Sequence, residues 1–564
     1  MTDRSIDGLL VLLVASLHAA AQNPTARTAI HTVPETANQQ RLEGPPLLPW
    51  MPRPAVAPAG AMSHCGAWER DGYESIQVNV DRRGCNIVGD AANEPSIAVD
   101  HTDPRKLVIG WRQFDSVLSD FRQAGWGYSR DAGHTWVFQG SPTPGIFGSD
   151  PVLASGPGGE IYYLSTNFEE TRFFRSFDGG ITWSYTQAIS YFYDKPWMAV
   201  DLTSGPSRGN IYLTSLNYGR FFRSSDGGTT FTEYRPFGVS GDTLSVASDG
   251  TVYLAGGGSN GSSWEVFRST DAGDGFVIPT FSITDFCMFC RGARSGTGPN
   301  PGGLLGQLWV ATYSEPQAGA RHVYLLAPGP LDPTNTDFDF ADVVFMRSTD
   351  GGTSRTRPIP VNDDPPTRGS WQWFAMMSVA RNGRIDAVWN DTRNTGAVNL
   401  SELYYAYSTD AGSTWSTNVP LSQVFDSHVG WPQQAKIGDY YHMVSDNLGV
   451  NVAYAATFNG EQDVYFLRIG PWDCNGNDID DALDISELRS RDCNANGVPD
   501  ECEYRADFNG DGLTTLTDFA AFQKALTGPG VSLPADCTRL LDPDHDADID
   551  LHDFYLLTHV FVAP

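Results

Sequence analysis

The chain has 564 residues, which is too long for one ordinary core and indicates several domains or a repeat architecture. Its 67 acidic and 37 basic residues give a formal net charge of -30. A charge of this sign repels nucleic acid and anionic membrane surfaces, so neither is expected as a partner.

The N-terminus is predicted to be an export signal. Residues 9–17 form a short apolar run, LLVLLVASL, followed by small residues suited to cleavage near Ala21. The run is too short to span a bilayer, and no later run is long enough for a membrane helix. We therefore expect residues 1–21 to be the signal peptide of a secreted protein without a transmembrane segment. Residues 22–62 are rich in proline and are expected to be a linker.

The chain contains eight cysteines, and an even number in an exported protein favours disulfides. The local pairs are Cys65 with Cys85 and Cys287 with Cys290. The CMFC motif of the second pair could also be half of a metal site. No second CxxC and no histidine pair lies near it in the sequence, so a disulfide is favoured there too.

One short turn recurs along residues 63–470. It reads SRDAGHTW at 129–136 and follows the pattern S-x-D-x-G-x-T-W/F, with degraded copies at 269–276 and 348–355. An apolar strand enters each copy, and a repeated pair of strands lies upstream. The first four copies are about 45 to 48 residues apart, which is typical of one four-stranded propeller blade. The aspartates of the six copies are Asp131, Asp178, Asp226, Asp271, Asp350 and Asp410.

The two ends of this region complement each other. Residues 440–469 supply three strands without a turn of this kind, whereas ESIQVNV at 74–80 is a spare strand. We expect the spare strand to pair with the last blade, because a closed ring leaves no free sheet edge. The predicted fold class is all-β: a seven-bladed β-propeller, with six blades as the alternative, followed by a small α-helical calcium-binding module.

The recurring turns resemble the Asp-boxes, or bacterial neuraminidase repeats, of the β-propellers of the sialidase superfamily, over roughly residues 73–470. The resemblance implies that each turn joins the third and fourth strands of a blade. Its Asp would accept backbone N–H bonds, its Gly would take a conformation that other residues avoid, and its aromatic residue would pack between blades. The implied role of the six aspartates is structural, and the binding face is the opposite one.

The loops of that opposite face carry charged and aromatic residues. Such residues suit a sugar, since aromatic faces stack on pyranose rings and paired carboxylates catalyse glycoside hydrolysis. By resemblance, a sialidase holds the substrate carboxylate with three arginines and uses a Tyr–Glu nucleophile pair and an Asp acid/base. The early F/Y-R-I-P motif of the family is absent, so no arginine triad is assigned. The candidate catalytic residues are Arg112, Asp115, Tyr193, Asp194, Arg368, Asp391 and Arg393.

Two functions are consistent with these features. The first is a secreted, sialidase-like glycoside hydrolase acting on glycans, which the charged aromatic face favours. The alternative is a non-catalytic propeller that binds a glycan or a protein, which the missing motif favours.

The C-terminal segment, residues 506–564, contains two acidic loops with the spacing of EF-hand calcium loops. Apolar helical segments follow both loops. The pair resembles a dockerin, which implies Ca²⁺ binding and a cohesin-like scaffold or cell-surface partner. The expected ligands are Asp507, Asn509, Asp511, the Leu513 carbonyl and Asp518 in the first loop, and Asp542, Asp544, Asp546, Asp548, Asp550 and Asp553 in the second.

Residues 471–505 repeat the same ligand spacing twice, each time beside cysteine. They resemble thrombospondin type-3-like calcium repeats. The expected Ca²⁺ ligands are Asp473, Asn475, Asn477, Asp481 and Asp484, followed by Asp492, Asn494, Asn496, Asp500 and Glu503.

Overall fold

The computed structural model describes most of residues 60–502. The segments outside the described residues are 1–59, 168, 191–193, 216–219, 235–239, 258–263, 276, 284–297, 315–320, 330–340, 366–369 and 493–496, and beyond residue 502 only 519–520, 522–523, 526 and 549–553 are described. The loop 507–518, most of the loop 542–553, and Cys287 with Cys290 therefore lie outside the described part.

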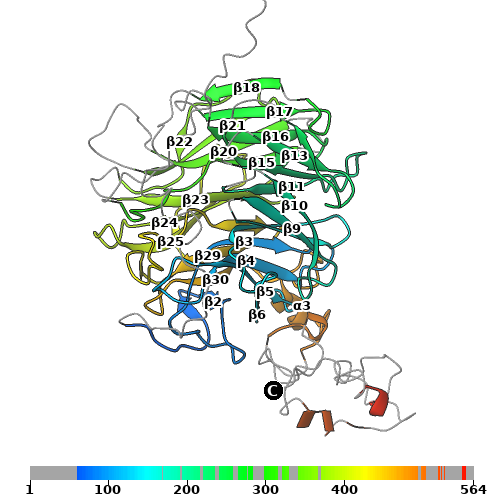
Figure 1. The fold of residues 1–564 in the computed structure, drawn as a ribbon, viewed down its shortest axis with the longest axis vertical. Coiled ribbons are helices and arrows are strands. Elements are labelled where there is room, and N and C mark those ends of the chain that lie inside the picture. Colours follow the sequence, from blue (N-terminus) through cyan, green and yellow to red (C-terminus); the bar gives the residue numbers. More distant parts are fainter. Residues whose placement is uncertain are drawn as a thin grey trace, which may run out of the picture.

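The described residues form seven antiparallel sheets arranged as a ring (Figure 1). The alternating apolar strands of the sequence are the reason, because each sheet is buried on both faces between its neighbours. Blade 1 consists of β3 (Ala91–Val99), β4 (Leu107–Phe114), β5 (Gln123–Ser129) and β6 (Val137–Gly140). Blade 2 consists of β7 (Ser149–Ser155), β8 (Ile161–Thr166), β9 (Glu170–Ser176) and β10 (Ser184–Ser190). Blade 3 consists of β11 (Trp197–Val200), β12 (Ile211–Thr214), β13 (Phe221–Ser224) and β14 (Thr232–Tyr234).

Blades 4 to 6 continue the same order, from the innermost strand outwards. Blade 4 consists of β15 (Ser240–Val246), β16 (Val252–Gly257), β17 (Trp264–Ser269) and β18 (Val277–Ile283). Blade 5 consists of β19 (Trp309–Ser314), β20 (Arg321–Gly329), β21 (Asp342–Ser348) and β22 (Ile359–Pro360). Blade 6 consists of β23 (Gln372–Val379), β24 (Ile385–Asp391), β25 (Leu400–Ser408) and β26 (Val419–Pro420), and β27 (Phe425–Asp426) also pairs with β25.

Blade 7 closes the ring with strands from both ends of the domain. It consists of β28 (His442–Ser445), β29 (Val450–Ala456), β30 (Asp463–Ile469), β2 (Tyr73–Gln77) and β1 (Trp68–Arg70), in that order. Ser75 pairs with Leu467, and the Val78 N–H donates to the Val464 carbonyl at 2.9 Å. The predicted closing strand and the seven-blade count are confirmed, and the six-blade alternative is wrong.

The innermost strands surround the propeller axis. Each contacts the innermost strand of the next blade, and β28 of blade 7 contacts β3 of blade 1. The largest apolar cluster runs through several consecutive blades and includes Trp197, Trp373 and Tyr454. This packing holds the strand ends around the axis in fixed positions.

The predicted local disulfide between Cys65 and Cys85 is present. It lies beside the closing strand, where it ties the residues before β1 to those after β2. A second disulfide joins Cys474 to Cys502. No helix among the described residues has the length and apolar character needed to cross a membrane.

The six recurring turns, called box turns below, share one hydrogen-bond scheme. In each, the serine hydroxyl donates to the aspartate and accepts the N–H of the glycine four residues after it, at 2.8 Å in every copy. The aspartate also accepts an N–H from the fourth residue after it, such as Thr230 N on Asp226 at 2.9 Å. The aspartates are therefore occupied within their own turns.

Each box turn also packs against the preceding blade. Gly228 has φ +82°, and a Cβ there would lie 2.2 Å from the Phe173 ring. Only glycine fits such a left-handed position at this distance. The aromatic residue of the same turn, Phe231, packs on Phe173 as well. The box turns thus fix the spacing of the blades on one face.

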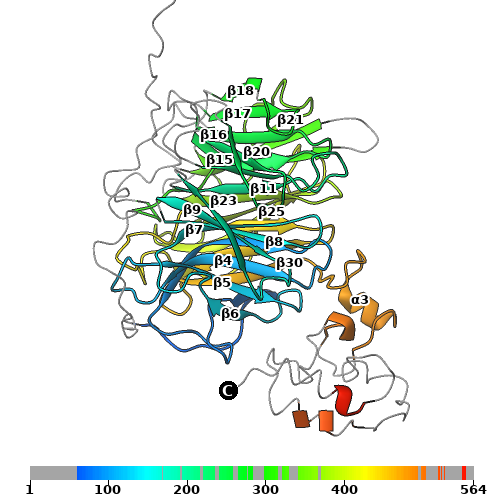
Figure 2. The same cartoon turned by 45° about the vertical axis from the view of Figure 1, so that its right-hand side comes forward.

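Residues 471–502, which follow the propeller, contact this face at blade 1. Trp472 stacks on His134 of the first box turn, with ring centroids 3.9 Å apart. Arg105 donates to the Glu501 carbonyl. Figure 2 shows the short helix α3 (Asp481–Ser486) outside the ring of blades. The variable histidine of the first box turn therefore contacts the next segment of the chain.

Candidate functional site

A charged residue precedes a proline near the start of three innermost strands, β3, β7 and β11, at the ends opposite the box turns. Glu94, Asp150 and Lys195 have φ of 53°, 51° and 41°. A non-glycine residue is strained in this region, and a following proline disfavours it further. The side chains are 1%, 2% and 4% exposed. Strained backbone of this kind is concentrated at functional sites.

A β-bulge places two of these side chains. The pairing of β3 with β4 shifts between Asn93 and Ser96, and that of β7 with β8 shifts between Ser149 and Val152. A bulge re-aims a side chain relative to the regular strand. Glu94 also requires a close approach at Gly438, where a Cβ would lie 2.6 Å from the Glu94 Cγ.

Ion pairs join residues of blades 1 and 3 to the segment before blade 7. Arg112 Nε lies 3.2 Å from a Glu94 oxygen. Lys436 Nζ lies 3.8 Å from the other Glu94 oxygen and 2.8 Å from Asp439. Lys195 Nζ lies 3.1 Å from the same Asp439 oxygen. This network lies at the innermost strands, which surround the propeller axis, and it is called the channel cluster below.

The carboxylates of the channel cluster have opposite environments. Neither Glu94 oxygen accepts a hydrogen bond from a described residue. Burial raises the pKa of Glu94 to about 8, against the opposing effect of Arg112 and Lys436. Burial also acts to raise the pKa of Asp439, but Lys195 and Lys436 outweigh it and hold that pKa well below its usual range. The surroundings therefore shift the pKa values of Glu94 and Asp439 in opposite directions.

Asp150 is the second carboxylate at the pre-proline position, one blade along from Glu94. It accepts the Lys195 N–H at 3.1 Å and the Ser149 hydroxyl at 2.5 Å. The negative charge of Asp150 in turn helps to raise the pKa of Glu94.

The sequence-predicted residues are divided between two places and the undescribed part. Arg112 belongs to the channel cluster, and Asp194 lies 3.8 Å from Lys195 Nζ at its edge. Asp115 is half-buried just after β4. Tyr193 and Arg368 lie outside the described residues.

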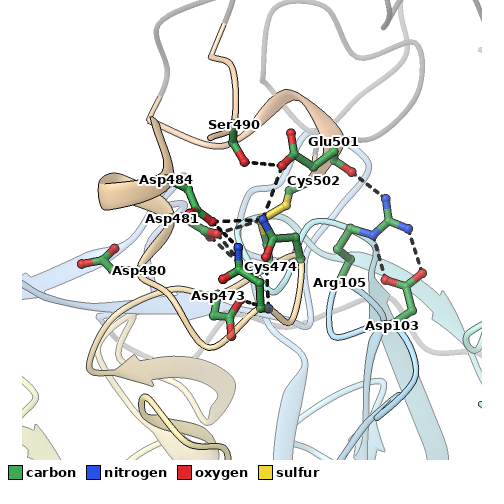
Figure 3. The surroundings of a disulfide bond; sticks show 12 residues. Asp103, Arg105, Asp473, Cys474, Asp480, Asp481, Asp484, Ser490, Glu501 and Cys502 are labelled. Atoms are coloured by element: carbon green, nitrogen blue, oxygen red, sulfur yellow. Dashed lines mark hydrogen bonds and ion pairs between the residues drawn. A yellow bond between two sulfur atoms is a disulfide. The ribbon is translucent and has the colours of Figure 1, made fainter. Parts of the chain in front are cut away.

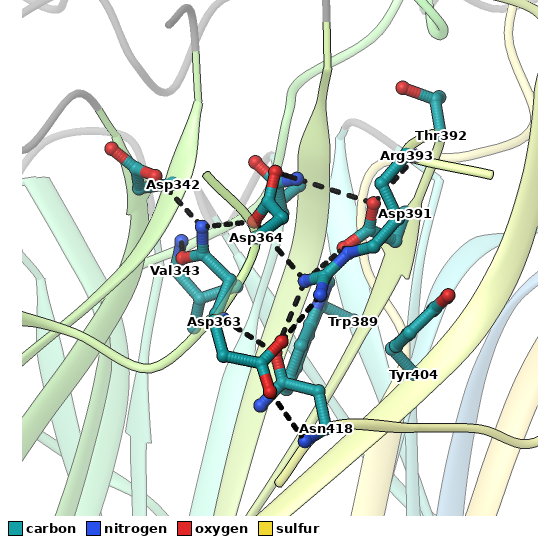
Figure 4. Close-up of polar contacts among 12 residues, drawn as sticks. Asp342, Val343, Asp363, Asp364, Trp389, Asp391, Thr392, Arg393, Tyr404 and Asn418 are labelled. Atoms are coloured by element: carbon teal, nitrogen blue, oxygen red, sulfur yellow. Dashed lines mark hydrogen bonds and ion pairs between the residues drawn. The ribbon is translucent and has the colours of Figure 1, made fainter. Parts of the chain in front are cut away.

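Arg393 and Asp391 form a separate cluster on blade 6 (Figure 4). The Arg393 guanidinium lies 2.8 Å from Asp391, 2.6 Å from Asp363 and 3.2 Å from Asp364. It also sits over the Tyr404 ring, 4.7 Å from its centroid. Arg393 is therefore paired with three carboxylates of the chain. It shares none of them with Arg112, which pairs with Glu94, so the two arginines belong to different clusters.

Sequence reasoning missed Glu94, Asp150, Lys436 and Asp439. A usable signal was present, because EPSIAV, DPVLAS and KPWMAV all place a charged residue before a proline near the start of an innermost strand. Lys436 and Asp439 lie in an irregular connection and carry no such signal.

The first predicted calcium loop, residues 473–484, is described in full (Figure 3). The Asn475 and Asn477 amides donate to the same Asp484 oxygen, at 3.1 and 2.6 Å. The other Asp484 oxygen is buried and has no hydrogen-bond partner. Since amide O and N are interchangeable assignments, the same residues can turn oxygens inward, and their donor set fits Ca²⁺. In the second loop, Asp492 and Asp500 are described, whereas Asn494, Asn496 and Glu503 are not.

No protein-family model and no curated protein matches this chain. Among solved structures, it is similar to an intramolecular trans-sialidase from Ruminococcus gnavus, with 13% identity, 63% of this chain and 98% of that chain covered, and a TM-score of 0.38. It is also similar to a leech intramolecular trans-sialidase, with 14% identity, coverages of 53% and 64%, and a TM-score of 0.35.

A similar overlap is found with hydrazine synthase from Kuenenia stuttgartiensis, with 11% identity, coverages of 68% and 98%, and a TM-score of 0.40. Similarity at this level, to proteins of such different named activities, carries no inference about chemistry. Function therefore has to be inferred from the channel residues.

Proposed function

We propose that this chain is a secreted glycoside hydrolase whose active site is the channel cluster. The observation that carries the proposal is Glu94, a buried carboxyl with a raised pKa that accepts no hydrogen bond from a described residue, one blade along from the hydrogen-bonded Asp150. Glycosidases use two carboxyl groups whose environments separate their protonation states.

The roles follow from these environments. Glu94 donates its proton to the glycosidic oxygen as the bond to the anomeric carbon breaks. The charge of Asp150 stabilises the positive charge that develops on that carbon. A water then adds to the carbon and gives its proton to the Glu94 carboxylate, which restores the starting state. Lys195 and Lys436 hold Asp439 ionised and so fix the charges around Glu94.

Sialidase-like action is the more specific form of this proposal. It is supported by the resemblance of the box turns to Asp-boxes and by Arg112, the sequence-predicted arginine that lies in the channel. An arginine can bind a substrate carboxylate in a bidentate manner.

A panel of fluorogenic glycosides that includes a sialoside tests the proposal. We expect turnover of at least one member. On the corresponding glycoside with a poorly acidic leaving group, Glu94→Gln should lose about 10²–10⁴-fold in kcat, the range for removal of a general acid. Asp226→Asn, in a box turn, is the control and should keep full activity. Absence of turnover across the panel would contradict the proposal.

A non-catalytic binding propeller is the second candidate. It is favoured by the mutual pairing of Arg112, Lys195 and Lys436 with carboxylates, because a self-satisfied buried network needs no substrate. In that case the panel is inert, and Glu94→Gln leaves stability unchanged or raises it, since it removes a poorly solvated acid.

We also propose that residues 473–484 bind Ca²⁺ and that the segment beyond them acts as a calcium-dependent docking module for a cohesin-like or cell-surface partner. Convergence of Asn475, Asn477 and Asp484 supports the first part. Calorimetry on the full chain should show one Ca²⁺ fewer for Asp484→Asn than for the parent chain. Equal uptake by the two chains would contradict it.

A further inference from the structure

Three buried carboxylates meet where the propeller ring closes. Asp90 precedes β3 of blade 1, while Glu461 and Asp463 lie at the start of β30 of blade 7. The three side chains are 3%, 0% and 0% exposed. One oxygen from each lies within 4.8 Å of the others. This group, called the closure cluster, is separate from the channel cluster and from the C-terminal loops.

Among the described residues, no positive side chain forms an ion pair with these carboxylates. None of the ion pairs within the described part of the chain involves Asp90, Glu461 or Asp463. Three carboxylates brought together away from water repel one another strongly unless a proton or a cation is bound.

The closure cluster is surrounded by neutral amide donors. Gln113 donates to Asp90 at 2.7 Å, Asn79 to Asp463 at 2.8 Å, and the Gly89 N–H to Glu461 at 2.8 Å. These donors orient the carboxylates but bring no net charge. The arrangement is that of ligands held by an outer layer of hydrogen bonds.

Two buried oxygens at the closure cluster have no partner. The second Asp90 oxygen accepts no hydrogen bond. The Asn459 amide donates to Asp463 at 2.9 Å, and its own oxygen is also buried without a partner. A buried acceptor without a donor is unfavourable, so two together call for a ligand that accepts electron pairs.

We propose that the closure cluster is a Ca²⁺ site, with Asp90, Glu461 and Asp463 as carboxylate ligands and Asn459 as a neutral oxygen ligand. All four donors are oxygens, which excludes a preference for Zn²⁺ or Cu²⁺. Mg²⁺ retains several waters and is less suited to a site this buried. The ion would link blade 7 to blade 1 four residues before Glu94, so it would stabilise both the ring and the mouth of the channel.

Equilibrium dialysis and thermal unfolding of the full chain test this site apart from the C-terminal ones. The test variant is Asp90→Asn/Asp463→Asn, which keeps side-chain size. The matched control is Asp473→Asn/Asp484→Asn, which alters the first C-terminal loop. We expect each variant to bind fewer Ca²⁺ than the parent chain, with exactly one ion per chain lost from the closure cluster.

The unfolding temperature of the propeller distinguishes a ligand role from a packing role. Ca²⁺ should raise it by several degrees over EDTA in the parent chain and in the control, and not in the closure variant. In EDTA the closure variant should be at least as stable as the parent, because repulsion between carboxylates has been removed. Undiminished Ca²⁺ uptake, or an equal Ca²⁺-induced shift in the closure variant, would overturn the proposal. A response to Mg²⁺ in place of Ca²⁺ would overturn the choice of ion.

Discussion

The two faces of the propeller use carboxylates in opposite ways. On the box-turn face, each aspartate accepts hydrogen bonds from its own turn, and these bonds lower the pKa of Asp350 and Asp410 to about 2. On the channel face, Glu94 is buried without a hydrogen bond, and its pKa is raised to about 8. The same chemical group accepts hydrogen bonds within its turn on one face and is buried without one on the other.

The two faces also differ in what is repeated from blade to blade. The box turns repeat their residues because each blade needs the same local bonds. The pre-proline positions of blades 1 to 3 repeat only their backbone, and the side chain changes from Glu to Asp to Lys. A shared backbone with different charges is suited to building one asymmetric site from several blades.

The largest expected effect on the free energy of unfolding comes from opening the ring next to its closing strand. Val78→Pro removes the buried N–H that donates to Val464 beside the closing strand. We expect it to lower the free energy of unfolding by about 3 kcal/mol or more, and to exceed the effect of Val78→Ala, which keeps that bond, by about 1–3 kcal/mol. Chemical denaturation of both variants checks this. Equal losses would mean that closure does not depend on the bond.

The pH dependence of stability sharpens the contrast. The pKa of Glu94 is about 8 in the folded chain, against an ordinary 4.5. The folded state therefore holds a proton that the unfolded state releases, and the contribution of Glu94 is full below pH 4.5 and is lost as the pH rises through 8. Unfolding measured from pH 5 to 9 should show this loss in the parent chain and not in Glu94→Gln. A parallel profile in the two chains would contradict the assignment.

Box aspartates should show the opposite sign. The pKa values of Asp350 and Asp410 are about 2, below the ordinary 3.8. Their stabilising effect is present above pH 3.8 and is lost as the pH falls through 2. Acid unfolding of Asp410→Asn should accordingly begin from a lower stability and fall less steeply than that of the parent chain. An identical acid limb would argue against the hydrogen-bond scheme.

The smallest expected effect compares two box turns. Asp226 accepts bonds from Thr230 N and from the Thr230 hydroxyl, whereas in the fourth turn Gly275 replaces threonine and Asp271 receives only the backbone bond there. Asp226→Ala should therefore cost about 0.5–1.5 kcal/mol more than Asp271→Ala. Denaturation midpoints measure the difference, and activity should stay constant in both. An equal or larger cost at Asp271 would contradict a stabilising role for the bond from the Thr230 hydroxyl.

Much of the fold could be predicted because its determinants are local. The box turns, the strand alternation and the spare strand at 74–80 indicated seven blades and their closure, and the spacing of Cys65 and Cys85 indicated their disulfide. The channel cluster could not be predicted in the same way. Glu94 meets Lys436 only after the ring closes, and the partners of Arg393 come from segments on both sides of it. Arg112 was selected because its segment is charged; the structure places it inside β4, not in a loop, and its partner Glu94 was not predicted.

The most direct test of the account is the dependence of activity on the leaving group. If Glu94 donates the proton, Glu94→Gln should lose about 10²–10⁴-fold in kcat on glycosides with poorly acidic leaving groups. It should lose far less on aryl glycosides whose phenolate leaves without protonation. The parent chain and Asp226→Asn should show no such split. An equal loss on both kinds of substrate, or no loss at all, would contradict the assignment of Glu94 as the acid.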